Sequence, residues 1–152
     1  MSSFEDIKNR LVGWKASGSH TGDLAALRRM GNEALQVLAR EGAFLIGPQE
    51  KGWLVVGYLI SLGIPDVPKK GAACFYSSGI SEERMRQLLG GRDIADGVRR
   101  SAGMLKAGVD MTDVFWSVVK WDKPEKRKSI QANWWMAYYG GKDVSDKDAD
   151  KA

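Results

Sequence analysis

The sequence GPQEKGWLVVGYLISL, residues 47–62, decides the fold of this 152-residue chain. Pro48 stands where the first turn of a helix tolerates proline. Apolar side chains then fall on nearly every side of a helix, at Trp53, Leu54, Val56, Tyr58, Leu59, Ile60 and Leu62. The β-branched residues also allow a strand, but no run of similar character elsewhere could pair with it. We therefore predict a central buried helix.

Segments on both sides of this run have the spacing of amphipathic helices. Apolar residues recur at steps of three and four near the start, at Phe4, Ile7, Leu11 and Trp14, and near the end, at Ile130, Trp134, Ala137 and Tyr138. Ser81 and Asp110 stand where a helix would need a cap. Because no alternating strand pattern appears, the sequence predicts an all-α bundle of about eight to nine helices.

A break near the middle of the chain suggests two small helical lobes. Residues 63–68, GIPDVP, contain two prolines that no helix interior would accommodate. We place the lobes at residues 1–64 and 65–141, packed against each other. Residues 142–152 hold four aspartates and three lysines with little apolar character, so we expect a disordered tail there.

Composition points toward a polyanionic partner. The formal net charge is +4 and the isoelectric point about 9.2. Cys74 is the single cysteine, which fits a reducing cytoplasm. Charged residues interrupt the N-terminal segment, which therefore lacks the continuous apolar core of a signal peptide. The longest apolar run is about ten residues, whereas a membrane span needs roughly 20. We expect a cytoplasmic protein without membrane contact.

Motifs for catalysis are missing from the sequence. His20 is the single histidine, and it lies in a loop without partners for a zinc site or a catalytic triad. The acidic pairs Asp93, Asp96 and Asp110, Asp113 have the positions of helix caps, with metal binding as an open alternative. We expect no enzyme activity, no cofactor and no metal site.

Basic residues carry the functional hypothesis. Guanidinium and ammonium groups neutralise nucleic-acid backbones without reading bases, and the opposing interpretation is a solvated helix face of mixed sign. Three of them stand in the first turn of the last helix, where the helix dipole disfavours cations, so they should stabilise nothing locally. The candidate nucleic-acid-binding residues are Arg28, Arg29, Arg84, Arg92, Arg99, Arg100, Lys126, Arg127 and Lys128.

The tryptophans are six, an unusual number for this length. Trp14, Trp53 and Trp134 fall on apolar stripes and should pack in the core. Trp121 and Trp135 stand at or beyond the edge of their stripe, so we expect them to face a partner protein.

The stretch from Ser81 to Tyr139 resembles the C-terminal half of the CasB family, the small subunit of the type I-E CRISPR surveillance complex. The matching features are the helix start Glu82-Glu83-Arg84, Gln87-Leu88-Leu89 before a turn, the pair Arg99-Arg100, and a late basic helix rich in tryptophan that ends in aromatic residues. A weaker match lies in Leu27-Arg28-Arg29.

This resemblance implies an all-α protein of two packed lobes, present in two copies and bound to other subunits along the guide-RNA-bearing backbone of the complex. The implied partners are guide RNA, the target DNA backbone and the displaced strand. In RNA-guided recognition, base pairing reads the sequence and the protein stabilises the opened duplex.

A rival interpretation is a DNA-binding regulator. Residues 84–100 also fit a helix-turn-helix, with Gly90-Gly91 in the turn. A regulator would bind one operator sequence by itself, whereas the small-subunit hypothesis predicts weak, salt-sensitive binding without sequence preference.

Overall fold

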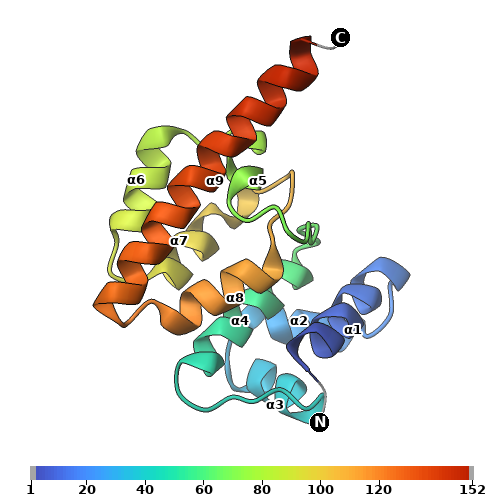
Figure 1. The fold of residues 1–152 in the computed structure, drawn as a ribbon. Coiled ribbons are helices and arrows are strands. Elements are labelled where there is room, and N and C mark those ends of the chain that lie inside the picture. Colours follow the sequence, from blue (N-terminus) through green and yellow to red (C-terminus); the bar gives the residue numbers. More distant parts are fainter. Residues whose placement is uncertain (1–2, 151–152) are drawn as a thin grey trace.

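The computed structural model describes residues 3–150, with side chains up to residue 140 (Figure 1). Within that part the chain forms nine α-helices and one short 3-10 helix, which confirms the all-α prediction. The elements are α1 (Phe4–Ser17), α2 (Thr21–Arg29), α3 (Asn32–Arg40), α4 (Pro48–Ser61), α5 (Ala73–Ser77), α6 (Glu82–Gly90), α7 (Ile94–Ser101), η1 (Ala102–Met104), α8 (Met111–Lys120) and α9 (Pro124–Asp150). None of the helices within residues 3–150 has both the length and the apolar character of a membrane span.

Helix α4 is the central buried helix that the sequence predicts. It packs against α2 and α8 over most of its length and touches α1, α3 and α7. Gly52 makes the close approach of α8 possible, because a Cβ atom there would lie 2.9 Å from the Phe115 ring. Trp53 and Phe115 then pack together beneath Phe4, with the Phe4 and Phe115 rings stacked at 4.3 Å.

The two halves of the chain share one hydrophobic core. Buried residues from both sides of residue 64 belong to a single cluster. The proline-containing linker also pairs with the second half, since the Val67 amide donates to the Val109 carbonyl at 2.8 Å and the Val109 amide donates to the Pro65 carbonyl at 2.9 Å. Residues 1–64 and 65–141, the two predicted lobes, are therefore joined by side-chain packing, and the linker is joined to the second half by main-chain hydrogen bonds.

The helix caps predicted at Ser81, Asp93 and Asp110 are present, and Ser3 provides another. Ser3 forms a reciprocal capping box with Asp6, and Ser81 accepts a hydrogen bond from the Arg84 amide. Asp93 and Asp110 cap α7 and α8 in the same way. Helix α9 continues to Asp150 and so includes residues 142–150 of the predicted tail; their side chains, and residues 151–152 as a whole, lie outside the described residues.

Lys8 is a buried cation that ties α1 to the linker. Its side chain is 2% exposed, and its Nζ lies 2.9 Å from Glu5 Oε2 and 2.7 Å from Asp66 Oδ2. Asp66 also accepts a hydrogen bond from the Met111 amide at the start of α8. Burial lowers the pKa of Lys8, but the hydrogen bonds to Asp66 and Glu5 outweigh it and leave the pKa raised.

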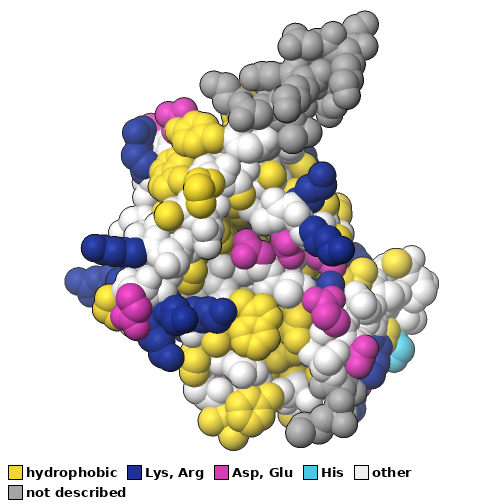
Figure 2. Space-filling model, in the orientation of Figure 1, with side chains coloured by type: hydrophobic (Ala, Val, Ile, Leu, Met, Phe, Trp, Pro, Cys, Tyr) yellow, Lys and Arg dark blue, Asp and Glu magenta, His cyan; other side chains and the backbone are white. Residues whose placement is uncertain are grey.

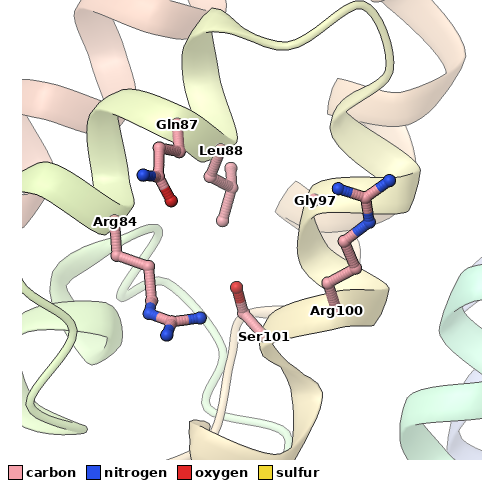
Figure 3. A pocket seen from close by; sticks show the side chains of 6 residues that line it. All are labelled: Arg84, Gln87, Leu88, Gly97, Arg100 and Ser101. Atoms are coloured by element: carbon pink, nitrogen blue, oxygen red, sulfur yellow. The ribbon is translucent and has the colours of Figure 1, made fainter.

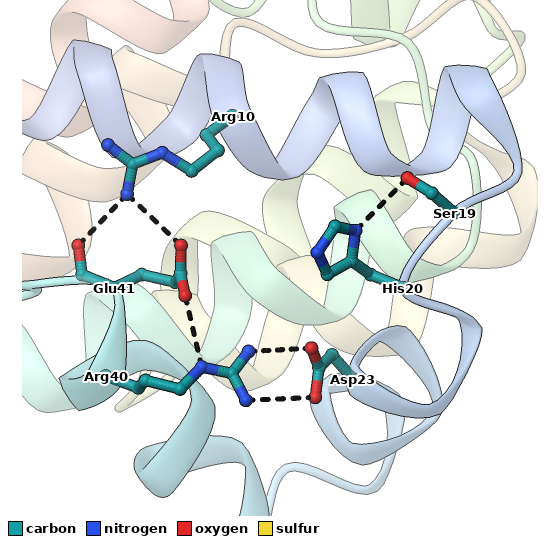
Figure 4. Close-up of polar contacts among 6 residues, drawn as sticks. All are labelled: Arg10, Ser19, His20, Asp23, Arg40 and Glu41. Atoms are coloured by element: carbon teal, nitrogen blue, oxygen red, sulfur yellow. Dashed lines mark hydrogen bonds and ion pairs between the residues drawn. The ribbon is translucent and has the colours of Figure 1, made fainter.

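Further ion pairs connect the first three helices (Figure 4). Arg40 on α3 binds Asp23 on α2 and the Glu41 carboxylate, which in turn accepts a hydrogen bond from Arg10 on α1. Arg10 and Arg40 thus have carboxylate partners within the fold.

Candidate nucleic-acid interface

Two of the predicted basic residues line the same pocket. Arg84 on α6 and Arg100 on α7 lie on opposite sides of a small pocket of about 90 Å³ (Figure 3). The Gln87 amide lies on the same side as Arg84, and the Arg84 guanidinium points toward Ser101, whereas the Arg100 side chain extends along α7. The pocket is therefore lined by two arginines, an amide and a hydroxyl.

Local sequence explains why α6 and α7 meet here. The helices are separated by a turn of three residues, 91–93, and each begins with a side-chain cap. Gly97 faces Leu88 so closely that an added Cβ atom would lie 3.0 Å from the Leu88 side chain. Leu88, which is 4% exposed, is the apolar side chain of the pocket lining.

The electrostatics of the pocket favour an anion. No carboxylate is among the residues that line it. Arg84 has no ion pair within the described residues, and Arg100 pairs with Asp96 at 2.7 Å on a side chain that is 73% exposed. Because exposed ion pairs contribute about 0–1 kcal/mol, a phosphate can compete with Asp96 for Arg100. Arginine matches phosphate with two parallel hydrogen bonds, so the pocket suits a nucleic-acid backbone.

A second basic surface surrounds the start of α9. Figure 2 shows Lys and Arg side chains gathered at the lower left, where α9 begins. Lys126 and Lys128 are exposed and have no ion pair in the described part of the chain, and Lys120 and Lys123 lie just before them. We call the set Lys120, Lys123, Lys126 and Lys128 the α9 basic cluster.

Arg127 differs from its neighbours, because it has contacts within the fold where the sequence predicts no local stabilisation. Its Nε donates to the Trp121 carbonyl at 2.9 Å, and its guanidinium covers the Trp121 ring at 5.2 Å. Arg127 therefore stabilises the turn between α8 and α9. Trp121 was also misplaced by the prediction, because it is 2% exposed and its indole donates to the Arg92 carbonyl at 2.9 Å.

The remaining predicted residues do not join the pocket. Arg28 donates to the Ser61 carbonyl at 2.8 Å and so caps the end of α4, while Arg29 pairs with Glu33. Both line a second pocket of about 320 Å³ together with Lys15, which sequence reasoning missed. Arg99 pairs with Asp96, and the Arg92 side chain is exposed.

The acidic pairs divide between capping and other tasks. Asp93 and Asp110 cap helices as predicted, whereas Asp96 pairs with arginines and Asp113 lies in the first turn of α8. Among the described residues, no three His, Cys, Asp or Glu side chains come together in a way that could hold a metal ion.

Asp113 gives the fold a pH dependence that can be measured. Burial, together with the negative charge of Asp110, raises the pKa of Asp113 from 3.8 to about 6. The folded state thus favours the protonated acid, and this stabilisation is present below pH 4 and is lost as the pH rises through 6. The Asp113→Asn variant has a neutral side chain at every pH, so its free energy of unfolding at pH 7–8 should exceed that of the native chain. We expect a difference of about 1 kcal/mol, less than the full pKa shift implies, because the side chain is only partly buried.

Thermal unfolding between pH 3.5 and 8 checks this prediction. The stability difference between the variant and the native chain should open between pH 4 and 6. A difference that stays constant over this range would show that Asp113 does not titrate with a raised pKa.

Comparison of the chain with models of protein families, with curated proteins and with solved structures gives no match in any of the three.

Proposed function

We propose that this chain is a non-catalytic subunit of an RNA-guided DNA surveillance complex of type I-E, where it binds nucleic-acid backbones through basic side chains. Its ligands are the guide RNA, the target DNA and the displaced strand. Its protein partners are the other subunits of the complex and a second copy of itself, as the resemblance to the CasB family implies. The work of the chain is to hold opened strands in place, not to read them.

The presence of Arg84 and Arg100 around one pocket whose lining holds no carboxylate supports this proposal. Guanidinium groups there can contact phosphates of a nucleic-acid backbone, and such contacts have no dependence on base identity. The α9 basic cluster adds further positive charge. His20 is the single histidine of the sequence, and its ring stacks on the Trp14 ring with 4.1 Å between centroids. It stands at the start of α2, whereas the pocket lies between α6 and α7, so we assign His20 no catalytic role.

A helix-turn-helix regulator remains the second candidate, because α6 and α7 are joined by a turn of three residues. In such proteins the N-terminal residues of the second helix contact base edges. Here Ile94 and Ala95 open α7 and are 0% and 4% exposed, whereas Arg99 and Arg100 lie in its last turn. This arrangement favours backbone contacts over base contacts.

Binding to unrelated DNA sequences separates the two candidates. The isolated chain should bind single-stranded and double-stranded DNA of several random sequences with affinities within about threefold, and all should weaken together as salt is raised, because phosphate contacts release counterions. Titrations by fluorescence anisotropy at 50 to 200 mM salt measure this. Affinity for one sequence that exceeds the others by about 1000-fold, as operator binding does, would instead identify a regulator.

Co-purification tests the place in a complex. A tagged chain recovered from its own cells should bring with it protein subunits and a set of short guide RNAs that share their ends and differ in the middle. Recovery of the chain alone, from cells that express such RNAs, would contradict the proposal.

A further inference from the structure

An aromatic pair lies on the surface of α9, beyond the basic start of the helix. The rings of Trp135 and Tyr139, one helical turn apart, are stacked with 5.8 Å between centroids and 18° between planes. Tyr139 is 40% exposed, Met136 is 66% exposed and Trp135 is half-buried. By contrast, Trp14, Trp53, Trp121 and Trp134 are each at most 7% exposed.

Positive charges flank this aromatic pair. Lys128 precedes Trp135 by seven residues, so both lie on the same side of α9, about 10 Å apart along its axis. Arg86 comes from α6, which runs beside α9 and is joined to it where Gln131 donates to the Leu89 carbonyl at 2.7 Å. Burial and hydrogen bonding with Glu82 raise the pKa of Tyr139, and the nearby positive charge of Arg86 opposes this shift without cancelling it.

The same face of the molecule presents both features. In Figure 2, hydrophobic side chains gather over the upper part of α9 and α6, and Lys and Arg side chains gather below them and beside them. Proteins that bind single strands combine a basic track for phosphates with aromatic side chains on which bases stack. A purely apolar protein partner would leave Lys128 and Arg86 without counter-charges at the edge of the contact.

We propose that Trp135 and Tyr139 form a stacking platform for unpaired bases of a nucleic-acid strand whose backbone lies along Lys128 and Arg86. This inference rests on the proposed function and narrows it, because a stacking platform selects an unpaired strand over a duplex. In a duplex the faces of the bases are already covered by their neighbours. Stacking is tolerant of sequence, since every base has a π-face, so the platform adds no preference for one sequence.

An oligonucleotide without bases tests the platform. Binding of a 12-nucleotide DNA single strand is compared with binding of the same strand in which abasic residues replace the central nucleotides, so that the phosphate charge is equal. The native chain should bind the normal strand at least about fivefold more tightly, the lower limit for one stacked base. The double variant Trp135→Leu, Tyr139→Leu should bind both strands with the affinity that the native chain has for the abasic strand.

Two control variants make the result specific. Trp135→Phe with Tyr139→Phe keeps two rings and should retain most of the preference for the normal strand. Met136→Ala removes an exposed apolar side chain on the adjacent face of α9 and should leave both affinities unchanged. Thermal unfolding confirms that each variant is folded.

The possible results distinguish failure of the stacking platform from failure of the proposed backbone binding. If the native chain binds normal and abasic strands equally well, the platform is refuted while backbone binding stands. If the leucine variant keeps the full preference, the rings do not stack on bases and the aromatic face belongs to a protein contact. If neither strand binds at low salt, both the platform and the proposed backbone binding fail.

Discussion

Replacement of Lys8 by alanine is expected to lower the free energy of unfolding by about 3 kcal/mol or more, the largest stability effect that the ion pairs of this chain should show. Lys8 is 2% exposed, and its two partners, Glu5 and Asp66, face it at 2.9 and 2.7 Å. Without the ammonium group, the Asp66 carboxylate, itself 9% exposed, becomes a buried charge without compensation. Urea unfolding of the native chain and the variant measures the loss.

A second substitution shows whether the uncompensated charge is the cause. Lys8→Met combined with Asp66→Asn removes both charges and keeps an oxygen that can accept the hydrogen bond from the Met111 amide. This double variant should recover most of the lost stability. Lys51→Ala, which breaks the exposed pair with Asp93, should cost under about 0.5 kcal/mol. A Lys8→Ala cost as small as that of Lys51→Ala would contradict the role assigned to Lys8.

Replacement of both Arg84 and Arg100 by alanine is expected to weaken binding of single-stranded DNA by about 100-fold at low salt. Each arginine should contribute about 1.5 kcal/mol, the lower range for charge-assisted hydrogen bonds, and 1.4 kcal/mol corresponds to a factor of ten. Stability should change by under about 0.5 kcal/mol, because both side chains are exposed helix residues. Fluorescence anisotropy with a labelled oligonucleotide measures the affinity.

A matched variant controls for the loss of net charge. Arg40→Ala with Lys51→Ala also removes two positive charges, from side chains that are 51% and 53% exposed and lie outside the pocket. This control should weaken binding by only a few fold, through the long-range field of the protein. Equal losses in the two double variants would mean that the chain attracts nucleic acid by its total charge and has no defined site.

The fold could be predicted from the sequence because its determinants are local. The apolar spacing of α4 and the caps at Ser81, Asp93 and Asp110 depend on residues that are neighbours along the chain. Both sets of signals act before any tertiary contact is formed, and the structure contains the helices that they predict.

Side chains with distant partners were the ones that prediction missed. Lys8 is buried because Asp66, 58 residues later, meets it in the folded chain. Trp121 is buried because the Arg92 carbonyl accepts its indole hydrogen bond and Arg127 covers its ring. Periodicity within one helix gives no information about such partners, so the sequence places Trp121 at a protein contact and predicts no local role for Arg127.

The sequence predicts which basic residues could contact nucleic acid, but not which of them lie together in the folded chain. Arg84 and Arg100 stood among the other basic residues without distinction. That they line one pocket depends on the close crossing of α6 and α7, which Gly97 allows at Leu88. Arg28 was included for its charge, yet its hydrogen bond to the Ser61 carbonyl could be found only once α2 was packed on α4.

The salt dependence of DNA binding tests the central claim most directly, because it counts the phosphates that the protein neutralises. The logarithm of the affinity should fall linearly with the logarithm of the salt concentration, and each phosphate contact on a single strand should contribute about 0.7 to the slope. The slope for the Arg84→Ala, Arg100→Ala variant should therefore be shallower than that of the native chain by about 1.4, while the Arg40→Ala, Lys51→Ala control keeps the native slope. Identical slopes for the native chain and the Arg84→Ala, Arg100→Ala variant would contradict the claim that this pocket holds the nucleic-acid backbone.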